Sequence, residues 1–134
     1  MNMQSPEQKK DIALLLLRIG VGIIFIIAGW SKLTGIDGVQ NFFGNIGIPL
    51  PGLMAWVVGL IEFVGGLMVL LGAYIRIPAI LLACVMLVAI LTVKIGQEFT
   101  ASRLEIMLLL VNVAFTLVGS GRFSVDDKLN KPDS

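Results

Sequence analysis

Long apolar runs separated by short polar stretches dominate the pattern of this chain. Four runs are long enough, or nearly long enough, to cross a bilayer as a helix, which takes about 20 residues. They cover residues 12–33, 53–73, 77–95 and 104–121. The predicted fold class is therefore an all-α membrane protein, an antiparallel four-transmembrane-helix bundle whose single membrane domain spans residues 12–121.

The composition supports this membrane assignment. Hydrophobic residues make up 57% of the 134 residues, and charged residues make up only 14%. A soluble domain of this size cannot bury so much apolar side chain, because too much of its volume lies near the surface. The net charge of +1 offers no basic face. A nucleic-acid partner is therefore not expected, and the lipid bilayer is the expected surrounding.

The first apolar run resembles a secretory signal in one respect, because Lys9 and Lys10 precede it. Its length, the presence of Arg18 and the lack of a small-residue cleavage site after it favour a retained helix. Pro6 and Gln8 occupy positions typical of a helix start, after a serine at the N-cap. The first helix is therefore expected to begin before the apolar run.

Basic residues near the helix ends predict the orientation in the membrane. Six lie on one side and three on the other, which places both termini in the cytoplasm. The six are Lys9, Lys10, Arg76, Arg122, Lys128 and Lys131, and the three are Lys32, Lys94 and Arg103. Residues 1–11 then form a cytoplasmic N-terminal segment, and residues 122–134 form a cytoplasmic polar tail that is expected to be disordered.

The connection between the first two runs, residues 34–52, is long and rich in Gly, Asn and Pro, which are typical of turns. It also contains several apolar side chains. We expect it to lie on the bilayer surface or to cap the bundle, with a plain flexible loop as the alternative. The apolar residues are Phe42, Phe43, Ile46, Ile48 and Leu50.

Each predicted helix carries one stripe of small or polar residues when successive positions are placed at about 100°. Glycines at helical spacing let two helices approach closely, so these stripes are expected to face other helices. The residues that define them are the packing glycines Gly22, Gly29, Gly59 and Gly66, together with Asn112 and Thr116 on the fourth helix.

Charged residues inside the apolar runs are candidates for function. A central acidic residue costs about 2.5–3.5 kcal/mol on insertion scales, so Glu62 needs a partner or a role. Counting about 1.5 Å per residue from the ends of the runs brings Arg18 within reach, and the two are predicted to form an intramembrane polar pocket. Lys32, Lys94 and Glu105 are predicted to form an outer polar cluster, with solvation by water and headgroups as the alternative.

The residue types that are absent limit the chemistry. The sequence has no histidine, and Cys84 is its single cysteine. Bis-histidine haem ligation, an internal disulfide and a cysteine-ligated cluster are therefore excluded within one chain. No nucleotide-binding motif is present, and no catalytic or metal-binding residue is assigned. A redox role would need electrons carried by a bound quinone or by a partner subunit.

Three stretches resemble the DoxX family of small four-helix membrane proteins. They are "LLRIGVGIIFIIAGWSKLTG", "FFGNIGIPLP" and "LIEFVGGLMVLLGAYIRIPAILLACVMLVAI". The family pattern is an Arg, a Gly-x-x-Lys, a Gly-x-Pro, a Glu-x-x-Gly-Gly and a basic residue. Its positions fall on Arg18, Gly29 and Lys32, Gly47 and Pro49, Glu62 with Gly65 and Gly66, and Arg76. The resemblance covers roughly residues 13 to 90.

The resemblance implies a bacterial or archaeal protein of the inner membrane. The family is tied to an archaeal thiosulfate:quinone oxidoreductase, and mycobacterial relatives resemble a scaffold that joins redox enzymes. The leading interpretation is a redox-associated membrane subunit that binds quinone or a partner enzyme, at most a non-catalytic or quinone-binding subunit of an oxidoreductase complex. Self-association stays open. The alternatives are a small proton-coupled transporter of the four-helix type and a purely structural membrane protein.

Overall fold

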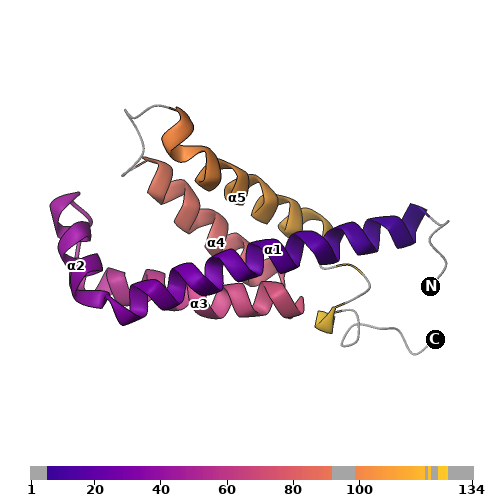
Figure 1. Cartoon of the computed structure of the whole chain (residues 1–134), viewed down its shortest axis with the longest axis horizontal. Coiled ribbons are helices and arrows are strands. Elements are labelled where there is room, and N and C mark those ends of the chain that lie inside the picture. Colours follow the sequence, from indigo (N-terminus) through magenta and orange to yellow (C-terminus); the bar gives the residue numbers. More distant parts are fainter. Residues whose placement is uncertain (1–5, 92–98, 120, 122–123, 127–134) are drawn as a thin grey trace.

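A computed structural model describes residues 6–91, 99–119, 121 and 124–126. The described residues are arranged as five helices with no sheet between them (Figure 1). The helices are α1 (Pro6–Thr34), α2 (Ile36–Asn45), α3 (Pro51–Leu71), α4 (Arg76–Ala89) and α5 (Phe99–Val118). Among the described residues, α1 and α3 are long and apolar enough to cross a membrane, judged by length and composition.

The four predicted helices correspond to α1, α3, α4 and α5, with shifted ends. α1 is already helical at Pro6, as the start signals predicted. Helical conformation continues past the end of α4 through residues 90 and 91, and the rest of that predicted helix lies outside the described residues. α5 begins at Phe99, before the apolar run, and ends at Val118.

The connection between α1 and α3 contains a helix that the sequence analysis did not predict. In α2, Ile36, Val39 and Phe43 recur at spacings of three and four, which is the period of an α-helix. Phe43 is buried. Nε2 of Gln40 donates a hydrogen bond of 3.0 Å to the carbonyl of Gly52 at the start of α3. Most of the connection is thus an ordered amphipathic helix that packs on α3.

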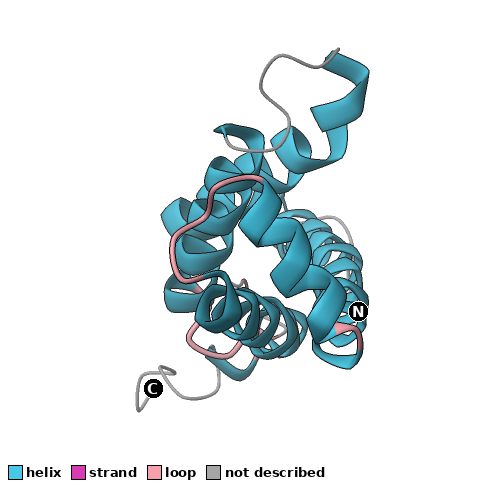
Figure 2. Cartoon of the chain, turned by 90° about the vertical axis from the view of Figure 1, so that its left-hand side faces the viewer, coloured by secondary structure: helices cyan, strands magenta, loops and turns pink. Residues whose placement is uncertain are grey.

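The long helices form two antiparallel pairs, α1 with α3 and α4 with α5. The pairs meet mainly where α4 packs on α3, and α1 touches α5 only slightly. In Figure 1 the pairs converge near the α3–α4 turn and diverge toward the end where α2 lies. Figure 2 shows the helices from that end. We call the end where the pairs converge the closed end and the end where they diverge the open end.

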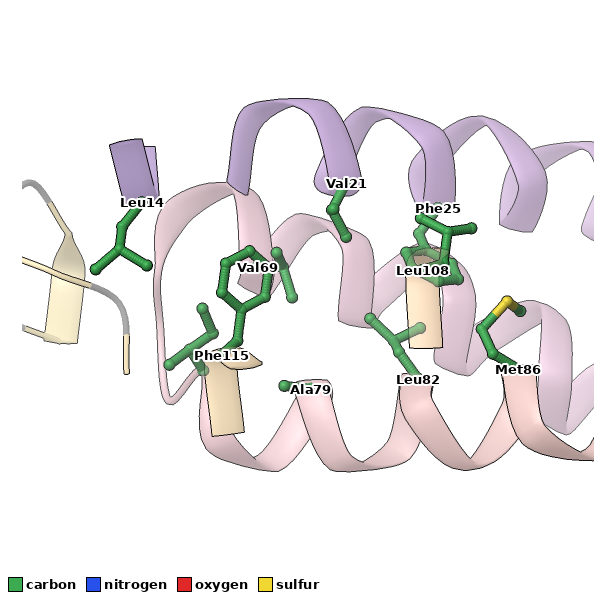
Figure 3. Close-up of a cluster of buried hydrophobic side chains, with 10 residues drawn as sticks. Leu14, Val21, Phe25, Val69, Ala79, Leu82, Met86, Leu108 and Phe115 are labelled. Carbon is green, nitrogen blue, oxygen red and sulfur yellow. The ribbon is translucent and has the colours of Figure 1, made fainter. Parts of the chain in front are cut away.

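Buried apolar side chains join the two pairs toward the closed end. Phe25 from α1, Val69 from α3, Leu82 from α4 and Phe115 from α5 belong to one cluster and are each at most 1% exposed (Figure 3). Because all four long helices contribute to this cluster, it holds the pairs together at one end and leaves them free to diverge at the other.

Glycines bring α1 and α3 into direct backbone contact. A Cβ added to Gly22 would lie 2.9 Å from the carbonyl oxygen of Gly66, and a Cβ added to Gly66 would lie 2.9 Å from the carbonyl oxygen of Gly22. A Cβ at Gly29 would overlap the backbone of Phe63. Gly20, also in α1, has nothing within 4 Å. The contact therefore depends on which α1 positions are glycine.

The turn between α3 and α4 lies at the closed end and begins at Gly72, whose φ of 71° favours glycine. The amides of Gly72 and Ala73 donate to the carbonyls of Val69 and Met68, which is the hydrogen-bond pattern of a Schellman motif. Tyr74 then adopts a left-handed conformation with φ of 48°. α3 therefore stops abruptly, and α4 can turn back against it.

Part of the C-terminal tail packs against this turn. The carboxylate of Asp126 accepts hydrogen bonds from the amides of Tyr74 and Ile75, and the amide of Asp126 donates to the carbonyl of Gly72. Ser124 is buried. The expectation of a disordered tail is therefore wrong for residues 124–126, because the carboxylate binds backbone amides that the turn leaves without helical partners.

The glycine contact predicts opposite effects of one substitution at two positions of α1. Gly29→Ala is expected to destabilise the protein by about 1–3 kcal/mol, because the new methyl group overpacks the contact with α3. Gly20→Ala meets no neighbour, and alanine favours the helix by at most about 1 kcal/mol, so its stability should be equal or higher. Unfolding in detergent followed by circular dichroism measures both, and equal destabilisation would contradict the contact.

Candidate ligand-binding site

Glu62 lies near the middle of α3 and is 2% exposed. Its Oε1 is 2.6 Å from Nζ of Lys32, at the end of α1. Gly59, one turn earlier in α3, leaves room for α1 at this point, because a Cβ there would lie 3.5 Å from Cβ of Lys32 and 2.9 Å from Cδ2 of Leu33. Gly59 thus lets α1 come close to α3, and the buried carboxylate of Glu62 then binds the ammonium group of Lys32.

The predicted pairing of Glu62 with Arg18 is wrong. Arg18 is 1% exposed, and its Nη1 donates a hydrogen bond of 3.1 Å to the carbonyl of Leu70. It also interacts electrostatically with Asp126. Leu70 is eight residues beyond Glu62, which amounts to about 12 Å along α3. Arg18 therefore belongs to the closed end, where it ties α1 to the end of α3 and to the C-terminal segment.

The helix register explains this correction. The close approach of Gly22 to Gly66 places Arg18, one turn before Gly22, level with Leu70, one turn after Gly66. The same antiparallel register brings the C-terminal end of α1 level with Glu62. Lys32, which was predicted to belong to an outer cluster without Glu62, is therefore the residue that reaches this carboxylate.

A cavity of about 490 Å³ lies between the helix pairs, on the side of the open end. Its wall is mostly apolar and is formed by every helix. The charged groups at its wall are Lys32, Glu62 and Glu105. α2 and the segment after it contribute Phe42, Phe43 and Ile48. The cavity thus combines a large apolar volume with a small group of charges that face it.

Of the other two members of the predicted outer cluster, the structure describes only Glu105. Glu105, in α5, lines the same cavity as Lys32 and is partly buried. Lys94 lies outside the described residues. The described part of that cluster therefore faces the cavity together with Glu62, which gives one ammonium group and two carboxyl groups at its wall.

The predicted polar stripe of the fourth helix is not part of the cavity wall. Asn112 is fully buried, and its Nδ2 donates a hydrogen bond of 2.8 Å to the carbonyl of Leu108. Oγ1 of Thr116 donates to the carbonyl of Asn112 at 3.0 Å, and Nε of Arg76 donates to the carbonyl of Thr116. These three side-chain hydrogen bonds go to carbonyls of α5, so the stripe contributes to the helix and to the α4–α5 contact.

Two parts of the cavity wall were missed by sequence reasoning. The aromatic residues of α2 were assigned to a connection expected to lie on the bilayer surface or to cap the bundle, and their helical spacing was not used as a signal for a helix. Cys84 was considered only as a redox group, yet it lines the cavity and is exposed. No signal in a single sequence marks an exposed residue of α4 as a cavity residue, because this depends on how far the helix pairs diverge.

The chemistry of this site is that of binding and of proton or charge balance. No group of three or more His, Cys, Asp or Glu that could hold a metal ion occurs among the described residues. The Lys32 ammonium group can donate hydrogen bonds, and the carboxyl groups can accept them. A molecule that fits this wall is largely apolar and carries a polar group that forms hydrogen bonds with these side chains.

The matching family model decides the identity. The DoxX model matches residues 13–95, which is more than half of the chain. The chain belongs to the DoxX family. Arg18, Lys32 and Glu62, whose positions define the two ends of the α1–α3 contact, all lie within the part that matches.

Curated relatives agree with the DoxX assignment. The chain is 40% identical over 117 residues to "Putative oxidoreductase CatD" of Bacillus subtilis (strain 168), which covers 87% of this chain and 86% of that protein. It is 36% identical over 129 residues to "Inner membrane protein YqjF" of Escherichia coli (strain K12), covering 93% and 98%. It is 35% identical over 72 residues to "Inner membrane protein YphA" of the same strain, covering 54% and 51%.

This DoxX protein is accordingly an integral membrane protein with relatives in the bacterial inner membrane. No solved structure matches the chain.

The ion pair predicts non-additive effects of substitution. Glu62→Gln and Lys32→Met should each destabilise this DoxX protein, because each leaves one charged partner near the apolar interior. The double variant should be less destabilised than the sum, with a coupling energy of about 1–3 kcal/mol. The control is the double variant Arg18→Gln with Glu62→Gln. Its change in the free energy of unfolding should equal the sum of the two single changes to within about 0.5 kcal/mol. Unfolding free energies in detergent test this, and coupling to Arg18 in place of Lys32 would refute it.

Proposed function

We propose that this protein is a redox-associated subunit of the bacterial inner membrane, whose cavity binds a quinone-class molecule for a partner oxidoreductase. Four helices, α1, α3, α4 and α5, would cross the bilayer as an antiparallel bundle, and α2 would lie at the outer surface. Both termini would be cytoplasmic. The observation that carries the proposal is the apolar cavity with the Lys32–Glu62 ion pair at its wall.

The size and polarity of the cavity support a ligand of this class. Ligand sites typically have volumes of about 300–1,000 Å³ and apolar walls with a few polar groups that orient the ligand. The volume of about 490 Å³ falls in this range. A quinone has an apolar ring and tail with two carbonyl oxygens. The ammonium group of Lys32 could donate a hydrogen bond to one carbonyl, while Glu62 holds the lysine in position.

A quinone would supply the capacity to accept electrons and protons, for which this chain offers few groups of its own. The sequence contains no histidine and one cysteine. Electrons would therefore come from a partner enzyme, and the role of this subunit would be to bind and orient the quinone. The name of the Bacillus subtilis relative, "Putative oxidoreductase CatD", supports a redox context.

The distribution of charge supports the proposed orientation. In the sequence, six Lys and Arg residues flank the apolar runs on the side of the two termini, and only three flank them on the other side. The side with more basic residues is usually cytoplasmic.

Reporter fusions test the orientation. A fusion of green fluorescent protein to the C-terminus should fluoresce, and an alkaline phosphatase fusion at the same position should be inactive, because the C-terminus stays in the cytoplasm. An active phosphatase fusion would overturn the proposed topology.

Binding of decylubiquinone to the protein in lipid nanodiscs tests the proposed ligand. The double variant Lys32→Met with Glu62→Met removes both charges together and should remain folded. A charge-assisted hydrogen bond contributes about 1.5–3 kcal/mol, so its affinity for decylubiquinone should fall about ten-fold or more. Lys10→Met, which removes one charge from an exposed part of α1 outside the cavity, is the control.

The control should bind like the natural protein. Failure of the natural protein to bind decylubiquinone would contradict the proposal. Proton-coupled cation uptake by liposomes in the absence of quinone binding would instead favour a small transporter.

A further inference from the structure

The cavity extends outward between α3 and α4 to the surface of the molecule. Val57 and Ile61 line it from α3, and Leu81, Cys84 and Val88 line it from α4. We refer to these five residues as the α3–α4 mouth. Its α4 side is also surface: Leu81 is 44% exposed and Val88 is 50% exposed. Residues that both line the cavity and face outward mark a place where the wall is open.

The α3–α4 mouth lies at the depth of the ion pair. Glu62 is ten residues before Gly72, and Cys84 is nine residues after Ile75, so both lie about 13–15 Å from the α3–α4 turn. The hydrocarbon core of a bilayer is about 30 Å thick. If these helices span it, the mouth opens near the middle of the hydrocarbon and far from either aqueous surface.

α2 lies at the open end of the cavity and narrows it, although Phe42 is itself 46% exposed. Phe43 of α2 is buried and lines the cavity together with Phe42 and Ile48. The hydrogen bond from Gln40 to Gly52 fastens α2 to the start of α3. A solute that enters at this end passes the aromatic side chains of α2 and reaches the charged groups from water, whereas a molecule dissolved in the bilayer meets only the apolar side chains of the mouth.

We propose that the ligand reaches the cavity laterally from the bilayer, through the α3–α4 mouth. The ligand is therefore a lipid-soluble molecule whose head group accepts a hydrogen bond. Its head group reaches Lys32 inside the cavity, and its apolar tail remains in the mouth. This inference rests on the proposed quinone-binding function and adds the route. A second exposed pair on the wall, Ile24 of α1 and Leu104 of α5, marks the opposite flank of the cavity.

Exchange kinetics distinguish these routes. Decylubiquinone bound to the protein in nanodiscs is mixed with quinone-free vesicles, and its release is followed over time; association is measured in the reverse mixing. Val88→Phe narrows the α3–α4 mouth and should slow association and dissociation together, about ten-fold, with a much smaller change in Kd, because an access route affects both rates alike.

The matched control is Leu87→Phe, the neighbouring residue of α4. Leu87 is exposed to a similar extent, 46%, but does not line the cavity, so its rates should equal those of the natural protein. Ile24→Phe narrows the opposite flank and should also leave the rates nearly unchanged.

Two results would overturn the lateral route through α3 and α4. One is that decylubiquinone associates and dissociates at equal rates in Val88→Phe and Leu87→Phe. The other is that Ile24→Phe slows these rates and Val88→Phe does not. Either result leaves the proposed quinone binding intact. Absence of any binding overturns the route and the proposed function together.

Cys84 provides a second readout in the natural chain, because it is the single cysteine of the sequence and lies in the α3–α4 mouth. Alkylation by the membrane-soluble reagent N-phenylmaleimide should slow when decylubiquinone is bound, since the tail then occupies the mouth. Decylubiquinone has a fully substituted ring and does not itself add to the thiol. Alkylation at an unchanged rate under saturating decylubiquinone would contradict a tail in the mouth.

Discussion

The register between α1 and α3 determines which charges meet inside this protein. It is set where glycine allows backbone to touch backbone, at Gly22 against Gly66 and at Gly29 against Phe63. Once these contacts are made, Lys32 lies beside Glu62 at one end and Arg18 lies beside the end of α3 at the other. Neither charge could reach the other's place without separating the two helices.

Arg18 and Lys32 then have separate roles. Arg18 donates to a carbonyl at the end of α3 and interacts with Asp126, whose carboxylate binds the amides of the α3–α4 turn. This arrangement holds the closed end, where the apolar cluster also joins all four long helices. Lys32 and Glu62 lie where the pairs diverge, at the wall of the cavity. Contacts at the closed end thus hold the helix pairs together, and the pairs can diverge at the open end around a cavity that can hold a ligand.

Much of this fold could be predicted from the sequence. The four apolar runs predicted the four long helices, and the helical spacing of glycines predicted those that lie in the α1–α3 contact. The pairing of Arg18 with Glu62 could not be resolved, because depth was counted from the ends of apolar runs. α1 in fact begins at Pro6, and its register is fixed by contacts with α3 that no single helix encodes.

The remaining differences have related physical causes. α2 was missed because its glycines and asparagines indicated turns, although its apolar residues had helical spacing. The ordering of Asp126 depends on backbone amides that become available only when α3 stops at Gly72. The cavity depends on the angle between the helix pairs, which follows from packing at the closed end. Features that arise from contacts between distant segments were thus the ones that sequence pattern could not supply.

The most direct test of this account is a distance measurement by solid-state NMR on the protein in bilayers. Lysine is labelled with ¹⁵N at Nζ and glutamate with ¹³C at Cδ, and their dipolar coupling is measured, with Lys32→Met used to assign the signal. An N–O separation of 2.6 Å predicts strong dephasing of one glutamate signal, lost in Lys32→Met. Dephasing that survives Lys32→Met, or no dephasing at all, would contradict the ion pair on which the proposed site depends.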